Sequence, residues 1–198
     1  MSSTTKRKAL LIRCEWVQSG NTLYEEYHDT EWGVPVHDDR KHFEFLILEG
    51  AQAGLSWLTI LKRRAEYAKA FANYDWEKVA DFGVKEVEKL LKESGIVRNR
   101  AKIESAINNA ERFVEIRKEF GSFDNYVWRF VEGKPLQPNR KTMKEIPSQT
   151  KESLALSKDL QKRGFRFVGP TIIYAHMQAT GLINDHTVDC FRFRPCQN

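Results

Sequence analysis

Residues 42–74 read HFEFLILEGAQAGLSWLTILKRRAEYAKAFANY. Apolar side chains recur in this stretch at three- and four-residue spacing, which is the period of an amphipathic helix. Gly50 and Gly54 are its weak points, because glycine costs about 1 kcal/mol relative to alanine inside a helix. The stretch therefore predicts helix, with an interruption near its glycines.

The same period covers most of the remaining chain. It extends over residues 76–83, 85–95, 99–121, 125–131, 150–164 and 169–181. We expect Gly95, Gly121 and Gly164 to end helices. Residues 131–150 contain three prolines, which predicts a loop. The pattern indicates an all-α fold.

Composition limits the classes of function. The 198 residues carry a net charge of +5. A basic surface favours a polyanionic partner, although many basic proteins bind none. Aromatic residues make up 12% of the chain and include five Trp, which suit stacking on bases but also ordinary core packing. No apolar run approaches the ~20 residues that span a bilayer, so we expect a soluble intracellular protein without membrane contact.

Cysteine and histidine form one pair near each end of the chain. Cys14 and His28 lie near the N-terminus, and His186 and Cys190 are four residues apart near the C-terminus. If the last segment is helical, His186 and Cys190 project from one face. Two Cys and two His are the ligands of a closed, structural zinc site. Chance scatter of three Cys and five His is the alternative, because the long gap fits no zinc-finger spacing.

A glycine turn between two helical patterns is followed by basic residues. Gly95 precedes Arg98, Arg100 and Lys102. A hairpin with glycine at positive φ aims the N–H groups of the second helix at a phosphate. The sequence thus indicates a DNA-backbone contact, but helices joined by a glycine turn also occur in most all-α proteins.

Glu49 follows an apolar run, and Trp57 lies about two helical turns further on. An acid on an apolar helix face is costly unless it is paired or used, so Glu49 and Trp57 are expected to face one cavity. A solvated or salt-bridged glutamate is the alternative. The aromatic residues around Cys14 and His28 suit a planar, electron-poor ligand, although core packing accounts for some of them; they are Trp16, Tyr24, Tyr27 and Trp32.

These segments together resemble bacterial 3-methyladenine DNA glycosylase I. The resemblance is carried by RCEWV, YEEYHDTEWGVP, FEFLILEGAQAGLSWLTILKRR, SGIVRNRAKI, KRGFRFVGPTIIYAHMQATGL and NDHTVDC, in that order between about residues 13 and 190. The resemblance implies a helix-hairpin-helix repair enzyme that hydrolyses the N-glycosidic bond of N3-methyladenine in double-stranded DNA. The expected products are an abasic site and free 3-methyladenine.

The resemblance also implies roles for individual residues. Glu49 would recognise the base, Tyr27 would add a hydrogen bond, and Trp57 would stack on the base. Gly54 and Leu55 would face the gap left in the DNA. The remaining implied sets are pocket aromatics Trp16, Tyr24 and Trp32, and zinc ligands Cys14, His28, His186 and Cys190.

The implied organisation is a flexible basic arm over residues 1–12 and a single glycosylase domain over residues 13–198. One lobe would hold the hairpin, about residues 40–130, and the other would combine both termini. We expect a cytoplasmic, bacterial monomer.

One departure from the family pattern concerns the hairpin, because general helix-hairpin-helix proteins have glycine at both ends of the turn and this chain has Val97 at the second. A non-catalytic zinc-stapled module that binds alkylated DNA is the alternative function; a zinc hydrolase would need an open metal position.

Overall fold

A computed structural model describes residues 11–197, and its regular structure is helical. The helices are α1 (Thr22–Thr30), α2 (Asp39–Gln52), α3 (Trp57–Leu61), α4 (Arg64–Ala70), α5 (Trp76–Ala80), α6 (Val84–Leu90), α7 (Arg100–Phe120), α8 (Phe123–Trp128), α9 (Lys151–Lys162) and α10 (Pro170–Ala179). Single 3₁₀ turns lie at Ala72–Tyr74, Arg129–Val131, Met143–Glu145 and Pro195–Gln197. The all-α prediction is confirmed for these residues. The expected arm over residues 1–12 lies, for residues 1–10, outside the part of the chain that the structure describes.

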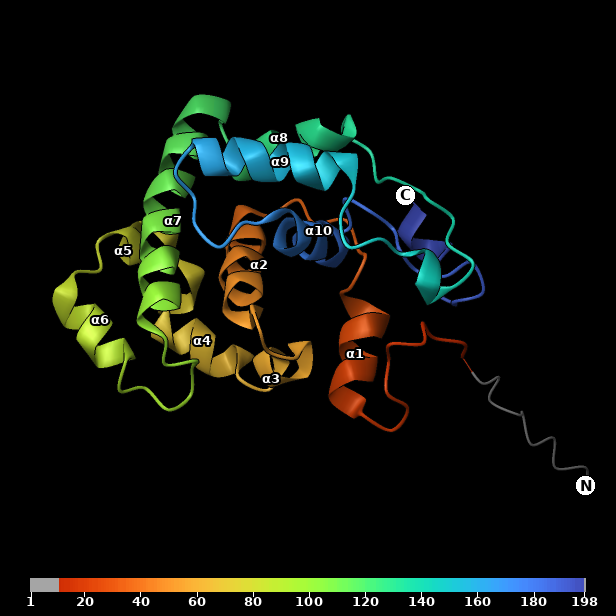
Figure 1. Ribbon diagram of the computed structural model, residues 1–198, viewed down its shortest axis with the longest axis horizontal. Coiled ribbons are helices and arrows are strands. Elements are labelled where there is room, and N and C mark those ends of the chain that lie inside the picture. The colour runs from red at the N-terminus through yellow and green to blue at the C-terminus, as the bar shows by residue number, and fades with distance from the viewer. Residues whose placement is uncertain (1–10, 198) are drawn as a thin grey trace, which may run out of the picture.

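Helix α2 occupies the centre of the molecule (Figure 1). It packs against α7 on one side and α10 on the other, and α9 lies along α10. The segment before α1 and the segment after α10 lie on the same side of the molecule (Figure 1). They are joined by a hydrogen bond from the Phe191 amide to the Ile12 carbonyl (2.9 Å). The fold therefore brings together the first and last segments of residues 11–197.

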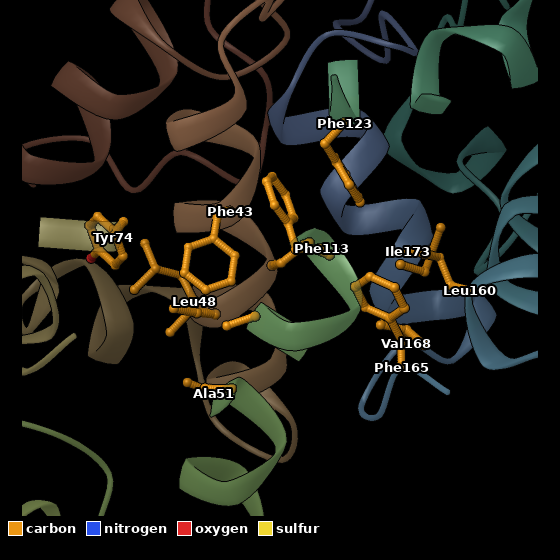
Figure 2. Close-up of a cluster of buried hydrophobic side chains, with 14 of the residues drawn as sticks. Phe43, Leu48, Ala51, Tyr74, Phe113, Phe123, Leu160, Phe165, Val168 and Ile173 are labelled. Carbon is orange, nitrogen blue, oxygen red and sulfur yellow. The ribbon is translucent and has the colours of Figure 1, made fainter. Parts of the chain in front are cut away.

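The core lies where α2, α7, α8 and α10 meet. Phe43 of α2, Phe113 of α7 and Phe123 of α8 are fully buried, and their side chains gather in one cluster with Ile173 (Figure 2). The rings of Phe113 and Phe123 stack with centroids 4.3 Å apart. Burying an aromatic or aliphatic side chain stabilises the fold by roughly 1.5–3 kcal/mol each. This cluster fixes α2, which carries Glu49, against its neighbours.

The break in the 42–74 pattern falls at Gly54. Helix α2 ends at Gln52, Gly54 takes a φ of +78°, and Ser56 caps α3 by accepting a hydrogen bond from the Thr59 amide. The other weak point, Gly50, stays helical. The predicted stops at Gly121 and Gly164 are confirmed, because both have positive φ at a helix end.

Gly95 does not behave as predicted. Helix α6 ends at Leu90, five residues earlier, and Gly95 is absent from the glycines with positive φ. Its glycine is required for another reason: a Cβ atom there would lie 2.6 Å from Cβ of Glu66. The connection is pressed against α4, where the Arg63 guanidinium donates to the carbonyls of Ser94 and Ile96.

The segment that holds His186 and Cys190 is not helical. It turns instead, with the Cys190 amide donating to the Thr187 carbonyl (2.8 Å) and the His186 amide to the Asn184 side chain. His186 and Cys190 therefore do not project from one face of a helix, as their four-residue spacing would have required. No helix among residues 11–197 is long and apolar enough to cross a bilayer.

His176 of α10 provides a test of the packing between α2 and α10. It is buried beside His42 of α2, with ring centroids 5.6 Å apart, and neither His176 ring nitrogen has a hydrogen-bond partner among the described residues. Burial, and then the proximity of His42, lower the pKa of His176 well below its ordinary value. The unfolded chain therefore binds this proton first, and stability falls as the pH drops below ~6.5.

We predict that His176→Met reduces this pH dependence. Urea unfolding at about pH 7 and pH 5.5 should show a smaller loss of unfolding free energy in the variant than in the wild type, because methionine cannot accept the proton. An equal loss in both proteins would show that His176 does not titrate as described.

Candidate functional site

The four Cys and His residues from the two chain ends converge. The ligand atoms of Cys14, His28, His186 and Cys190 all lie within 4.8 Å of one another, and all four residues are buried. The Cys190 sulfur lies 3.4 Å from Nε2 of His28 and 3.5 Å from Nδ1 of His186. Ligands bound at 2.0–2.3 Å in a tetrahedron are separated by roughly 3.3–3.8 Å. The spacing therefore fits one metal ion.

In each histidine, the ring nitrogen that faces away from the cluster contacts an oxygen atom of a neighbouring residue. Nδ1 of His28 contacts the Asp29 carboxylate (2.8 Å), which the Arg13 guanidinium grips with two nitrogens. Nε2 of His186 contacts the Trp32 carbonyl (3.0 Å). Such outer partners set the tautomer and ring orientation of metal-ligating histidines. The cluster could thus hold a metal through Nε2 of His28 and Nδ1 of His186.

Two further features fit this arrangement. Gly33 has a φ of +78°, and a Cβ atom there would lie 2.8 Å from Nε2 of His186, so only glycine leaves room for the ring. Hydrogen bonds from the Cys14 thiol, and then from His186 and His28, lower the pKa of Cys190. The pKa of Cys14 is raised, because its thiol keeps the proton that the pair shares. At least one thiolate, the metal-binding form, is therefore favoured.

A cavity of about 460 Å³ opens beside this cluster. Helices α1, α2, α3 and α10 and the 3₁₀ turn at Met143–Glu145 contribute to its walls. All six residues expected at a base pocket line it, namely Trp16, Tyr24, Tyr27, Trp32, Glu49 and Trp57. These aromatic side chains therefore form the wall of a cavity as well as packing in the core.

Glu49 supplies the charge-bearing group of the cavity. Its side chain is buried, with 4% exposure, and no hydrogen bond from another described residue reaches its carboxyl group. Burial alone raises the pKa of Glu49 to about 8. The solvated or salt-bridged glutamate that the sequence left open is thereby excluded. A buried acid without a protein partner costs free energy unless a ligand completes it.

The aromatic rings that line the cavity with Glu49 contact one another. Tyr27 and Trp57 have centroids 5.5 Å apart, and Trp16 contacts Trp32 edge to face at 5.1 Å. Tyr24 is fixed by accepting a hydrogen bond from the Leu58 amide. Burial, and then the charge of Glu49, raise the pKa of Tyr27, so its hydroxyl remains a donor. Faces and edges of this kind suit a flat, electron-poor ring.

Six lining residues were not singled out from the sequence. Gln178 is one; its amide nitrogen donates to the buried Asp185 carboxylate (2.8 Å), which also accepts from Tyr174. Met143 and Ile146 come from the loop predicted at residues 131–150. A loop has no repeating spacing of apolar residues from which its inward-facing side chains could be predicted. The others are Gln52, Ser56 and Ala175. Their positions depend on tertiary packing.

The turn between α2 and α3 reaches the surface. Leu55 is 41% exposed, and nothing lies within 4 Å of the position of a Cβ atom on Gly54. Leu55 lines a surface depression together with residues of the α6–α7 connection, including Arg98. The structure therefore brings Gly54, Leu55 and Arg98 to one face.

The other basic residues near Gly95 are engaged. The Arg100 guanidinium pairs with Glu88 (2.7 Å) and Glu104 (3.5 Å). The Lys102 ammonium turns inward and donates to the carbonyls of Ala51 (2.9 Å) and Ala53 (2.6 Å). Lys102 thus does not add to the outward charge that the sequence suggested.

A second helix pair fits a glycine hairpin better. Helices α9 and α10 pack side by side and are joined by residues 163–169, with Gly164 at a φ of +89° and Gly169 as the N-cap of α10. Asn109 of α7 secures the turn by accepting from the Arg166 amide and donating to its carbonyl. The sequence analysis placed the hairpin at Gly95 and missed this one, although glycine at both ends of the turn, in KRGFRFVGP, is a signal that could have found it.

The chain is similar to known proteins over most of its length. The family model described as methyladenine glycosylase matches residues 16–193. DNA-3-methyladenine glycosylase 1 of Escherichia coli K12 is 49% identical over 178 residues, which cover 90% of this chain and 95% of that protein.

Solved structures agree with the helical fold. A crystal structure of a 3-methyladenine DNA glycosylase I superposes with a TM-score of 0.88 at 47% identity, covering 91% of this chain and 98% of the other. A variant of a 3-methyladenine DNA glycosylase I in complex with 3-methyladenine superposes with a TM-score of 0.86 at 34% identity, covering 91% and 95%.

We predict that Glu49 titrates near pH 8 and that the pocket tryptophans report it. The emission of Trp57 and Trp32 should change across this pH range in the wild type and stay constant in Glu49→Gln, because only the carboxyl group gains charge inside the cavity. Glu26→Gln, at an exposed acid of α1, should keep the transition. A transition that survives in Glu49→Gln would contradict the assignment.

Proposed function

The chain belongs to the methyladenine glycosylase family, and from this premise we propose that it hydrolyses the N-glycosidic bond of N3-methyladenine in alkylated DNA. The products are free 3-methyladenine and an abasic site. The observation that carries the proposal is the buried carboxyl group of Glu49, which faces an aromatic cavity without a partner from the described residues. In this proposal the reaction takes place in the bacterial cytoplasm, on chromosomal DNA.

The chemistry requires few catalytic groups. Methylation at N3 makes the base cationic, so the base leaves as a neutral molecule without protonation by an acid. The enzyme must extract the nucleotide from the base stack, at a cost of a few kcal/mol, and hold it while water attacks the sugar. No lysine lines the cavity among the described residues, which supports hydrolysis without a Schiff base or strand cleavage.

Glu49 selects the cationic base. Its pKa of about 8 leaves the empty pocket mostly protonated near pH 7. Ionisation at that pH costs about 1.4 kcal/mol, since each pKa unit corresponds to that free energy. A hydrogen bond to a charged group contributes about 1.5–3 kcal/mol and offsets this cost, whereas a neutral hydrogen bond contributes about 0.5–1.5 kcal/mol. A cationic base therefore stabilises the carboxylate, and ordinary adenine does so much less.

The aromatic residues hold the flipped base in place. Trp57 stacks on the base and Tyr27 donates a hydrogen bond, while Trp16, Tyr24 and Trp32 complete the enclosure. All five line the cavity with Glu49. Contact between π faces and a positive ring adds about 0.5–2 kcal/mol per favourable pair.

The DNA surface comprises the α2–α3 turn and the glycine-containing connections. Gly54 and Leu55 fill the gap that the flipped nucleotide leaves, and Gly95, Arg98 and Arg100 lie along the backbone. The depression that Leu55 and Arg98 line together supports this placement. No ion pair joins Arg98 to an acidic residue among residues 11–197. The glycines at both ends of the α9–α10 turn support α9–turn–α10 as the helix-hairpin-helix element of the fold.

The metal is zinc, and its role is structural. Cys14, His28, His186 and Cys190 supply two sulfurs and two nitrogens, the donor set of closed zinc sites. Zinc bound there joins the two chain ends and adds no reactive water, since four protein ligands fill its coordination. Residues 13–198 then form one glycosylase domain with two lobes, one at about residues 40–130 and one made from both termini. The α9–turn–α10 hairpin lies outside the first lobe, where the sequence had placed the hairpin.

We predict that Glu49→Gln lowers excision of N3-methyladenine by about ten- to a hundredfold, because a neutral amide cannot match the positive base. Chromatography of bases released from methylated duplex DNA measures this loss. Affinity for undamaged DNA should stay unchanged. Release of no base by the folded wild type would favour the non-catalytic binding module, and equal release by both proteins would remove Glu49 from the role.

We predict that Cys190→Ser loses zinc and stability. The variant should contain less than one zinc per chain by elemental analysis and should unfold roughly 10 °C or more below the wild type, since several kcal/mol of metal-binding free energy is lost. Cys196→Ser is the matched control, because Cys196 is buried but lies outside the cluster. Full zinc content in Cys190→Ser would refute the ligand assignment.

A further inference from the structure

The C-terminal end of α2 is held by a side chain from another helix, an arrangement called the clamp below. The last carbonyl groups of a helix lack partners within the helix and carry the negative end of its dipole. Here the Leu55 amide donates to the Gln52 carbonyl, and a side chain from another helix completes the end. That side chain is Lys102 of α7, 49 residues from Ala53 in sequence.

Lys102 is placed inward rather than toward solvent. Its Nζ donates to the carbonyls of Ala51 and Ala53 at 2.9 and 2.6 Å, and the side chain is half-buried. Two charge-assisted hydrogen bonds from one ammonium group are among the stronger polar contacts available to a turn. The ammonium group thus spans the last turn of α2 and the first residue beyond it.

The residues that follow this clamp lead to the exposed tip. Ala53 has left the helical conformation (φ −42°, ψ 113°), and Gly54 and Leu55 then project from the surface. On the other side of the tip, the Ser56 side chain caps α3. The tip is therefore anchored on both sides, and the hydrogen bonds of Lys102 connect the residues that precede it to α7. Glu49 lies one helical turn before Ala53, on the same clamped end.

We propose that Lys102 is a positioning residue for excision, which holds the Gly54–Leu55 tip rigidly against the end of the helix that carries Glu49. This inference rests on the proposed function. In this proposal Lys102 contacts neither the base nor a phosphate. It keeps the Gly54–Leu55 tip at a fixed position relative to Glu49 while the nucleotide leaves the base stack. A preorganised tip does not have to be ordered during base flipping, which lowers the barrier to that step.

The experiment is a double-mutant cycle between Lys102 and Leu55. Excision from methylated duplex DNA is measured under single-turnover conditions for the wild type, Lys102→Met, Leu55→Ala and the double variant. Lys102→Met should lower the rate about tenfold in the wild-type background and by less than about twofold in the Leu55→Ala background, because the clamp acts through the tip. Equal reductions in both backgrounds, or no reduction, would overturn the proposal.

Salt dependence separates positioning from a phosphate contact. If Lys102 bound a phosphate, Lys102→Met would lower the slope of log affinity against log salt by about 0.9. The proposal expects an unchanged slope on undamaged duplex, and a lowered slope overturns it. Lys118→Met is the control for charge loss, since Lys118 is exposed on the same helix, and it should excise like the wild type.

Amide hydrogen exchange tests the clamp apart from catalysis. Exchange at the Leu55 amide should accelerate in Lys102→Met and not in Lys118→Met, while free 3-methyladenine still quenches the pocket tryptophans. Unaltered exchange at Leu55 overturns the proposal. If Lys102→Met does not fold, Lys102→Gln, whose amide keeps N–H donors but loses the charge, takes its place in every arm. An inactive wild type would refute the proposed function, while the exchange result would still decide the clamp.

Discussion

A buried carboxyl group that receives no hydrogen bond from residues 11–197 is the constraint on which this structure depends. Glu49 sits at the end of the central helix, and its desolvation raises its pKa to about 8. Isolated charge in such surroundings is costly, so the fold must compensate for the cost elsewhere. The phenylalanine core around α2, α7 and α8 supplies that stability and holds the carboxyl group in place.

The cavity around Glu49 is built by segments from opposite ends of the chain. Tyr24 and Tyr27 come from α1, and Gln178 comes from α10. The Cys and His cluster joins these ends, and the contact between His186 and the Trp32 carbonyl extends that junction to the pocket wall. A metal that takes no part in the reaction would in this way still determine the shape of the recognition site.

The sequence was informative where a residue type and a family pattern coincide. Helical periodicity predicted most helices, and the family resemblance named the six residues that line the cavity and the four that form the Cys and His cluster. Periodicity could not locate Met143 and Ile146, because loop side chains have no repeating spacing. It also misplaced the role of Gly95 and Lys102. Steric contact with Glu66 and the carbonyls of α2 explain these two residues, and both contacts depend on packing between distant helices.

Recognition of the base by Glu49 is tested most directly by the carbon-13 shift of its carboxyl group, followed by NMR near pH 7 before and after addition of 3-methyladenine. We expect a protonated carboxyl group in the free, zinc-loaded protein and an ionised one in the complex, as the proton moves from Glu49 to the bound base and an ion pair forms. A carboxyl group that is already ionised in the free protein, or that stays protonated in the complex, would contradict recognition of the base by charge.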